Sequence, residues 1–210
     1  MALNRSSLSE QIYDQLREDI LLGQIPAGQK LGLKELQEKF QVSSTAVREA
    51  LIRLSQEQLV TYTTNQGATV ITLDEEDVKH LLDLCRVYDC YAVEALCRNA
   101  DRDSIVLQLQ DAIQKQREFV KAEHAGLKEY GDILGCFHEI IYRATNNPWM
   151  ISHAIQCNRL LYLADVRTGT HKYPKSSIEE HQGILDAIQA GDCDKAIELA
   201  GLHRDQERNR

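Results

Sequence analysis

Hydrophobic residues recur at helical spacing in three segments of the first 60 positions. In the first segment they stand every four residues, at Leu8, Ile12, Leu16 and Ile20. This spacing predicts a helix, which Ser7 or Ser9 can cap. A second helix is predicted over residues 33–40. Its inward positions are Leu33, Leu36 and Phe40.

A third helix is predicted to begin after Ser43 or Ser44. Its buried stripe consists of Val47, Ala50, Leu51 and Leu54. Residues 59–63 and 68–72 are rich in Thr, Val, Tyr and Ile, and the turn between them predicts a hairpin. The order helix, turn, helix, wing is typical of domains that place a helix in the major groove of DNA.

The remaining two thirds of the chain are predicted to be helical throughout. The acidic run of residues 74–77 suits a helix N-terminus, because carboxylates stabilise the positive end of the helix dipole. We expect helices at residues 75–99, 103–123, 125–145, 148–168, 175–190 and 193–207. The predicted fold class is therefore mainly α, with a winged helix-turn-helix domain over residues 1–73 and an all-helical domain over residues 74–210.

Composition adds an expectation about compartment. Hydrophobic residues make up 43% and charged residues 27%, which is ordinary for a soluble globular protein. No apolar run approaches the roughly 20 residues of a membrane span, and the N-terminus lacks the apolar core of a secretory signal. We expect a cytoplasmic protein, with its six cysteines as buried reduced thiols. A redox role for Cys90 and Cys97 stays an alternative.

The net charge of -8 is unusual for a nucleic-acid binder, and its distribution explains how binding remains possible. Residues 1–70 carry seven Lys/Arg against eight Asp/Glu, whereas residues 71–210 carry 17 against 24. The acidity therefore lies in the helical part. DNA binding would depend on where a few cations point, and a dimer would double their contacts.

Several side chains of the winged segment suit contacts with DNA. Arg48 is long enough to reach a guanine edge, and small polar residues at the helix start can meet phosphates or bases. The predicted DNA-binding residues are Lys34, Ser44, Thr45, Arg48, Arg53, Asn65, Gln66 and Gly67. The alternative is a solvated helix surface, in which Glu49 pairs with Arg53.

Residues 7–71 resemble the winged N-terminal domain of the GntR superfamily. The resemblance rests on the segments at residues 13–17, 26–31, 35–36, 42–43, 47–51, 54, 59–60 and 67. It implies a regulator that binds operators as a dimer and changes that binding when an effector occupies the C-terminal domain. Family members commonly have Arg where this chain has Ser44 and often Arg where it has Lys34. Both changes alter how phosphates and bases can be bound.

Three histidines have a spacing that suggests a metal site. His181 and His203 are each 11 residues from Asp192, at the turn between two helices. Both therefore lie about 16 Å from the tip of a helical hairpin and can face each other. His138, from a neighbouring helix, could add a third imidazole, and such a set suits Zn, Ni, Mn or Fe. The alternative is three ordinary packed or surface histidines.

A second, weaker resemblance covers residues 74–207 and rests on the positions 137–138, 144, 147–148, 180–181, 184, 187–188, 191–192, 196 and 203. At these positions the chain resembles the helical effector-binding and dimerisation domain of the FadR branch of GntR regulators, called FCD. This resemblance implies that His138, His181 and His203 bind a divalent metal. It also implies a fourth ligand, an Asp one helical turn before His138, where this chain has Leu134. Asp132 lies two residues earlier and points about 120° away on a regular helix. The missing carboxylate would weaken the site or shift it toward a softer metal.

The same resemblance implies residues that bind an effector. Arg86 corresponds to an arginine that often faces the cavity, where a guanidinium could bind a carboxylate opposite a metal. The alternative is a surface Arg86 paired with Asp83 or Asp89. Asn147, which could instead cap its helix, and Arg159 complete the predicted effector-binding set. The effector is expected to be a small organic acid.

The leading hypothesis is a dimeric, metabolite-responsive transcriptional regulator, not an enzyme, that binds double-stranded operator DNA. A metal-dependent hydrolase using the three imidazoles is the first alternative. It lacks a carboxylate placed as an obvious general base and has no His-Glu-x-x-His motif. The second is an adaptor whose winged domain binds protein.

Overall fold

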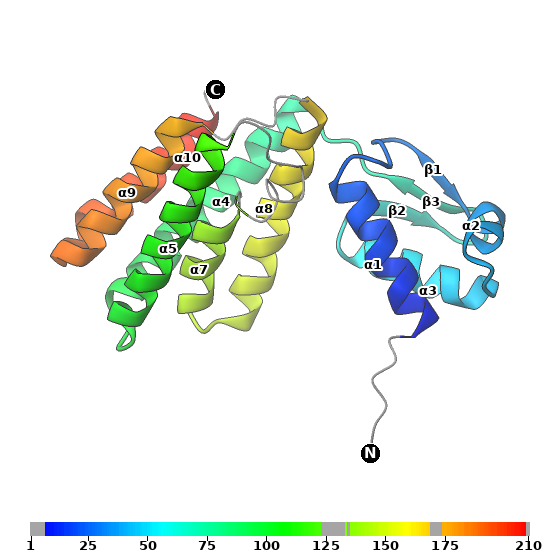
Figure 1. The fold of residues 1–210 in the computed structure, drawn as a ribbon, viewed down its shortest axis with the longest axis horizontal. Helices are drawn as coiled ribbons and strands as arrows, with labels where there is room; N and C mark the ends of the chain where they lie inside the picture. Colours follow the sequence, from blue (N-terminus) through cyan, green and yellow to red (C-terminus); the bar gives the residue numbers. More distant parts are fainter. Residues whose placement is uncertain (1–6, 123–132, 134, 169–173, 209–210) are drawn as a thin grey trace, which may run out of the picture. The chain divides into compact units, whose positions relative to one another are not determined.

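The computed structural model describes residues 7–122, 133, 135–168 and 174–208, which belong to two compact units. The first unit is Met1–Leu73 and the second is Asp74–Arg210. Figure 1 shows a small sheet with short helices in the first unit and only helices in the described part of the second. The predicted fold class, a winged helix-turn-helix followed by an all-helical bundle, is confirmed.

The helices of the first unit begin where their capping residues predict. They are α1 (Leu8–Leu21), α2 (Leu33–Phe40) and α3 (Ser44–Gln56). The Ser7 hydroxyl accepts a hydrogen bond from the Glu10 amide, and the Ser43 hydroxyl accepts one from Ala46. Each cap satisfies an amide that the helix itself leaves unpaired. Ser7 and Ser43 are therefore the caps, and not Ser9 or Ser44.

Three strands form the sheet of the first unit, one more than the sequence predicts. They are β1 (Lys30–Gly32), β2 (Val60–Thr63) and β3 (Gly67–Val70), in the order β1-β3-β2 and antiparallel. The hairpin of β2 and β3 is the predicted wing. The sequence did not predict β1, because a strand of three residues is too short to show an alternation of apolar and polar positions.

The predicted stripe of α3 forms the centre of this unit. Its four residues, Val47, Ala50, Leu51 and Leu54, have no exposed surface. Ile12, Leu16 and Ile20 of α1 pack against them, whereas Leu8 remains 59% exposed and Phe40 is only half-buried. The periodicity is therefore confirmed except at these two end positions, where the chain leaves the core.

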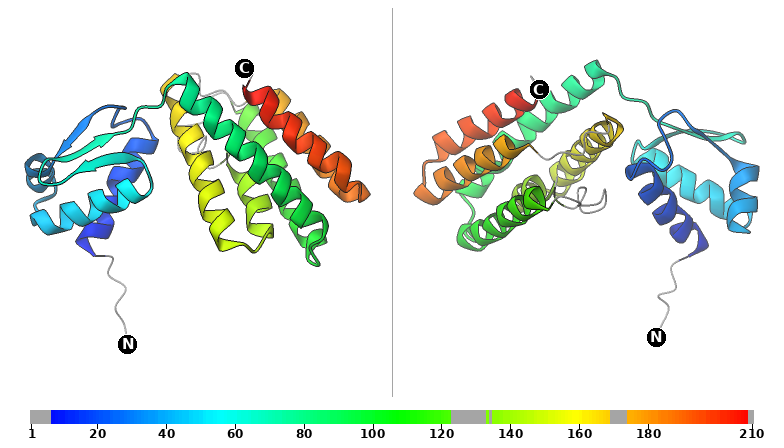
Figure 2. Two further views of the ribbon diagram at one scale, coloured as in Figure 1. Left: turned by 180° about the vertical axis from the view of Figure 1, so that it is seen from behind. Right: turned by 45° about the horizontal axis from the view of Figure 1, so that its top comes forward.

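The helices of the second unit are α4 (Glu75–Cys97), α5 (Arg102–Lys121), α7 (Cys136–Ala144), α8 (Pro148–Thr168), α9 (Lys175–Ala190) and α10 (Cys193–Arg208). Asp74 and Asp77 form a capping box that starts α4. α4 packs against α10, α8 and α7, while α5 packs against α9 and α7. The right view of Figure 2 shows α9 and α10 side by side and running in opposite directions.

One predicted helix is only partly confirmed. The prediction ran from 125 to 145, but α7 begins at Cys136, after a turn at Gly135. Residues 123–132 and 134 lie outside the described residues. In the part of the chain that the structure describes, no helix is long and apolar enough to cross a membrane. All six cysteines are free thiols, but only Cys85 and Cys157 are buried.

Candidate nucleic-acid interface and metal centre

A polar contact joins the outer face of α3 to the tip of the wing. The exposed Arg48 guanidinium donates a hydrogen bond to the side-chain oxygen of Asn65 at 3.1 Å. Asn65 adopts a positive φ of 63°, which the turn requires and asparagine tolerates. Two of the predicted DNA-binding residues are thus brought together from different elements. The contact holds Arg48 at the surface in a defined position.

Four other predicted DNA-binding residues are exposed or half-buried at the surface. The Lys34 side chain is 92% exposed and lies 4.0 Å from Glu38 on the same helix. Thr45 and Gln66 are exposed, and Ser44 is half-buried in the first turn of α3. The hydrogen-bond donors of these side chains are therefore available to the phosphates and bases of DNA.

Arg53 and Gly67 have structural roles that the sequence did not predict. The guanidinium of Arg53 lies over the ring of Tyr13, 3.9 Å from its centroid. Gly67 is buried, with a φ of 118°, and an added Cβ would lie 2.1 Å from the Leu31 carbonyl oxygen. The close approach that requires glycine is therefore to strand β1. Arg53 at least partly serves the packing of α3 on α1.

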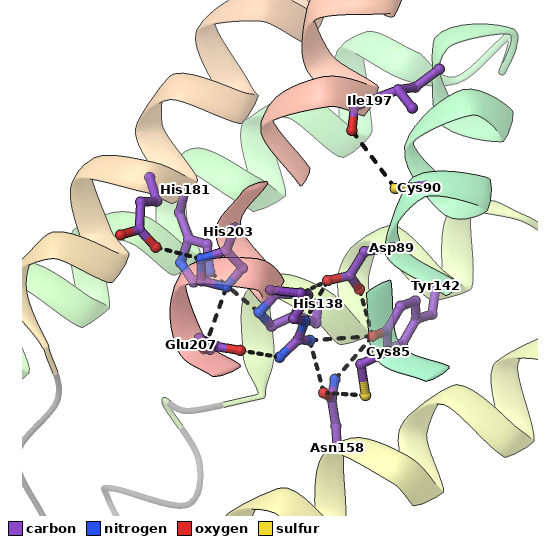
Figure 3. Close-up of polar contacts among 12 residues, drawn as sticks. Cys85, Asp89, Cys90, His138, Tyr142, Asn158, His181, Ile197, His203 and Glu207 are labelled. Carbon is purple, nitrogen blue, oxygen red and sulfur yellow. Dashed lines mark hydrogen bonds and ion pairs between the residues drawn. The ribbon is translucent and has the colours of Figure 1, made fainter. Parts of the chain in front are cut away.

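The three histidines predicted to bind metal converge in the interior of the second unit (Figure 3). His138 comes from α7, His181 from α9 and His203 from α10, and they are exposed by only 4%, 1% and 1%. One ring nitrogen of each lies within 4.8 Å of the others. The Nε2 atoms of His138 and His181 are 3.3 Å apart. The predicted facing of α9 and α10 across their turn is confirmed.

Neighbouring side chains orient two of these rings. Gln116 Oε1 lies 3.1 Å from His181 Nδ1, and Glu180 Oε2 lies 2.6 Å from His203 Nδ1. Phe137 stacks on His181 with ring centroids 4.1 Å apart. Such contacts on Nδ1 are typical of metal-binding histidines, because they leave Nε2 free to coordinate.

The distances and an unsatisfied nitrogen fit a metal ion. Two nitrogens bound at about 2.1 Å to one tetrahedral ion are about 3.4 Å apart, close to the separation of the His138 and His181 Nε2 atoms. Moreover, His203 Nε2 is buried and has no hydrogen-bond partner among the described residues. Buried polar atoms are rarely left in this state, so the cluster is suited to a cation that would satisfy it.

A buried ion pair adjoins the histidines. Asp89 accepts hydrogen bonds from Tyr142 at 2.6 Å and from Arg204 Nε at 2.7 Å, and its Oδ2 lies 3.2 Å from His138 Nδ1. Arg204 also donates to Asn158 at 2.9 Å. Burial opposes ionisation of Asp89, but Arg204 and His138 together hold its pKa well below the usual range. Asp89 is thus a charged group inside the bundle.

The protonation state of His138 also suits metal binding. Burial lowers the pKa of His138, and the positive charge of Arg204 lowers it further, while Asp89 acts in the opposite direction. The neutral imidazole is therefore favoured, which is the form that coordinates metals.

Two of the predicted effector-binding residues, Arg86 and Asn147, make contacts with residues other than the three histidines. Arg86 is half-exposed and pairs with Asp205 at 3.0 Å. This position agrees with the alternative of a surface ion pair, although the partner is neither Asp83 nor Asp89. Asn147 accepts a hydrogen bond from the Met150 amide and so caps α8. Arg159 lies half-buried on α8. The buried guanidinium beside the histidines is that of Arg204.

The sequence reasoning also missed the acidic groups of the site. Asp89, Glu180 and Glu207 all contact the imidazoles, although no such carboxylate was expected. Glu180 precedes His181 directly, and Glu207 follows His203 by one helical turn, so spacing could have shown both. Asp89 and Gln116 come from distant helices, and nothing local indicates them. Leu134 and Asp132 lie outside the described residues.

Comparison with known families now identifies the class of protein. The model of bacterial regulatory proteins of the gntR family matches residues 8–70, and the FCD domain model matches residues 80–206. The chain belongs to the GntR family and carries an FCD domain. It is a DNA-binding transcriptional regulator, and the two families and the relatives below give no support to the hydrolase alternative.

Individual relatives agree with this assignment along nearly the whole chain. BphR of Paraburkholderia xenovorans, an uncharacterised HTH-type transcriptional regulator, is 26% identical over 95% of this chain and 83% of its own. The HTH-type transcriptional repressor RspR of Escherichia coli is 26% identical over 95% and 86%. Among solved structures, E. coli McbR/YncC has a TM-score of 0.75 at 21% identity and covers 97% of this chain and 96% of its own. That similarity concerns the fold.

Proposed function

We propose that this regulator binds its operator as a homodimer and that a small organic acid in the metal-containing C-terminal unit modulates the binding. The observation that carries the proposal is the convergence of three buried imidazoles from α7, α9 and α10 in the second unit, whereas the winged domain forms the first. A site of this kind can bind a ligand, and its occupancy can shift the populations of two conformations.

The DNA end of the proposal rests on α3 and the wing. Arg48, Thr45 and Lys34 are exposed cations or hydroxyls on the helix-turn-helix, and Asn65 and Gln66 stand at the tip of the hairpin. We propose that Arg48 reaches a base edge and that Lys34 contacts phosphate, with Ser44 at the start of the recognition helix.

An exposed apolar stripe on α4 supports a dimer. Leu84, Val87 and Tyr91 are 48%, 62% and 47% exposed and recur at intervals of three and four residues, so they share one helix face. Exposed apolar surface of this kind is typical of protein interfaces. A second copy related by a two-fold axis would present the same stripe to it, which is the commonest arrangement in homo-oligomers.

We propose that His138, His181 and His203 hold a divalent metal of the Zn, Ni, Mn or Fe type. When bound, it would supply a positive charge that attracts an effector carboxylate. A groove between α5 and α7 supports access for a small molecule. Cys136 lines this groove and lies 3.9 Å from Gln116, the residue beside His181.

Retardation of duplex DNA tests the DNA end. The probe is DNA from upstream of the protein's own gene, titrated at several salt concentrations. We expect salt-dependent binding that is lost in Arg48→Ala and kept in Arg98→Ala, which removes an exposed arginine from the other unit. Equal binding by both variants would contradict the proposed role of Arg48 and favour the adaptor alternative.

A thermal-shift screen of small organic acids tests the effector end. The full chain is measured with each acid in the presence and absence of a chelator. A stabilising acid should lose its effect when the chelator removes the metal. An acid that stabilises equally under both conditions would contradict a metal-containing effector site.

A further inference from the structure

Glu207 stands next to a ligand atom of the histidine cluster. It follows His203 by four residues on α10, so both side chains lie on one helix face. Its Oε1 lies 3.5 Å from His203 Nε2, while Arg204 Nη1 donates a hydrogen bond to its Oε2 at 2.7 Å. Arg204 thus fixes one carboxylate oxygen and leaves the other facing the cluster, as Figure 3 shows for Glu207 and His203.

His203 Nε2, the nitrogen that faces Glu207 Oε1, is available to a metal ion. His203 Nδ1 is already engaged with Glu180, and His203 Nε2 is buried and has no hydrogen-bond partner among the described residues. A nitrogen and an oxygen bound at about 2.1 Å to one tetrahedral ion are about 3.4 Å apart. The separation of 3.5 Å between Glu207 Oε1 and His203 Nε2 therefore matches the one expected for two ligands of one ion.

Asp89, another carboxylate that contacts the imidazoles, is already hydrogen-bonded through both oxygens. Its two oxygens accept from Tyr142 and Arg204, and the same Oδ2 lies near His138 Nδ1. Glu207 Oε1 has no comparable donor among the described residues. The formal charges also favour a cation. The three carboxylates that contact the imidazoles and the Arg204 guanidinium together carry a charge of −2, which a divalent ion would neutralise.

We propose that Glu207 supplies the carboxylate ligand of the metal centre and replaces, from α10, the Asp that the family pattern places at residue 134. The inference rests on the metal centre of the proposed function. A carboxylate from a different helix completes the ligand set, so the substitution at Leu134 does not leave the centre with histidines alone. An effector would then have to add a further ligand or displace Glu207, and either event would act on α10.

Titration of the metal-free full chain with Co2+ tests this assignment, because its visible absorption depends on the ligands that surround it. Wild type and Glu207→Gln are compared with Glu198→Gln, which removes an exposed carboxylate from the same helix. We expect one Co2+ per chain in all three, with at least tenfold weaker binding and a changed absorption spectrum in Glu207→Gln alone. Glu207→Asp, which keeps the charge that Arg204 binds, should also change the spectrum, and circular dichroism checks that each variant is folded.

The possible results separate this inference from the metal centre itself. An unchanged spectrum in folded Glu207→Gln or Glu207→Asp, whatever the affinity, would overturn the inference and leave Glu207 as a positioning residue, while the metal centre would stand. Absence of Co2+ binding in wild type would overturn both.

Discussion

The two units of this regulator handle charge in opposite ways. The winged unit keeps its predicted DNA-binding cations at the surface, with Lys34 92% exposed and the exposed Arg48 hydrogen-bonded to Asn65. The helical unit buries Asp89 and Arg204 beside three histidines that are at most 4% exposed. Exposed cations suit a large anion that arrives from solvent, whereas buried donors suit a small ligand that they surround. The same chain therefore combines an exposed polar surface with a buried charged interior.

Removal of the buried guanidinium should have the largest effect on stability. Arg204→Ala leaves the buried Asp89 and the partly buried Glu207 without their cation, which costs about 3–5 kcal/mol of unfolding free energy. Arg208→Ala removes an exposed partner of Asp83 and should cost less than about 1 kcal/mol. Urea unfolding followed by circular dichroism measures both, and equal costs would show that the buried pair does not stabilise the unit.

Metal removal should affect only the helical unit. At a metal concentration 100 times the dissociation constant, binding stabilises the folded state by about 2.7 kcal/mol. Chelation should lower the melting temperature of wild type and leave that of His181→Ala nearly unchanged. Differential scanning calorimetry measures the shift, and a chelator effect of the same size in His181→Ala would place any bound metal elsewhere.

The stability of the winged unit should depend on the close approach of Gly67 to strand β1. Gly67→Ala places a Cβ 2.1 Å from the Leu31 oxygen in a strained conformation and should cost about 1–3 kcal/mol. Gly32→Ala is the matched control, because its Cβ would meet no atom closer than 3.7 Å. We expect the Gly67 variant alone to lose hydrogen-exchange protection across the sheet. Equal protection in both variants would contradict this role of Gly67.

The smallest effect should come from a single exposed cation. Lys34→Ala should weaken DNA binding uniformly across sequences and reduce the slope of log affinity against log salt by about 1. Lys121→Ala, an exposed lysine on α5, should leave the slope unchanged. Fluorescence anisotropy at several salt concentrations measures the slope. An unchanged slope in Lys34→Ala would remove the predicted phosphate contact.

The contrast between the units also explains what the sequence could predict. Helix periodicity and capping are local, so α1, α2, α3 and the buried stripe from Val47 to Leu54 followed from neighbouring residues. The facing of His181 and His203 followed from their equal distances to one turn. Asp89 and Gln116 reach the site only through the packing of α4 and α5, which no local pattern shows. The partner of Arg86 could not be predicted for the same reason, because its contact with Asp205 depends on how α4 packs against α10.

The central claim is that three buried imidazoles bind a metal in the sensing unit. It is tested most directly by elemental analysis of wild type and His181→Ala, both purified without a histidine tag and side by side. The account predicts about one divalent transition metal ion per wild-type chain and a large loss in the variant. Equal metal content in the two proteins, or none in wild type, would contradict it.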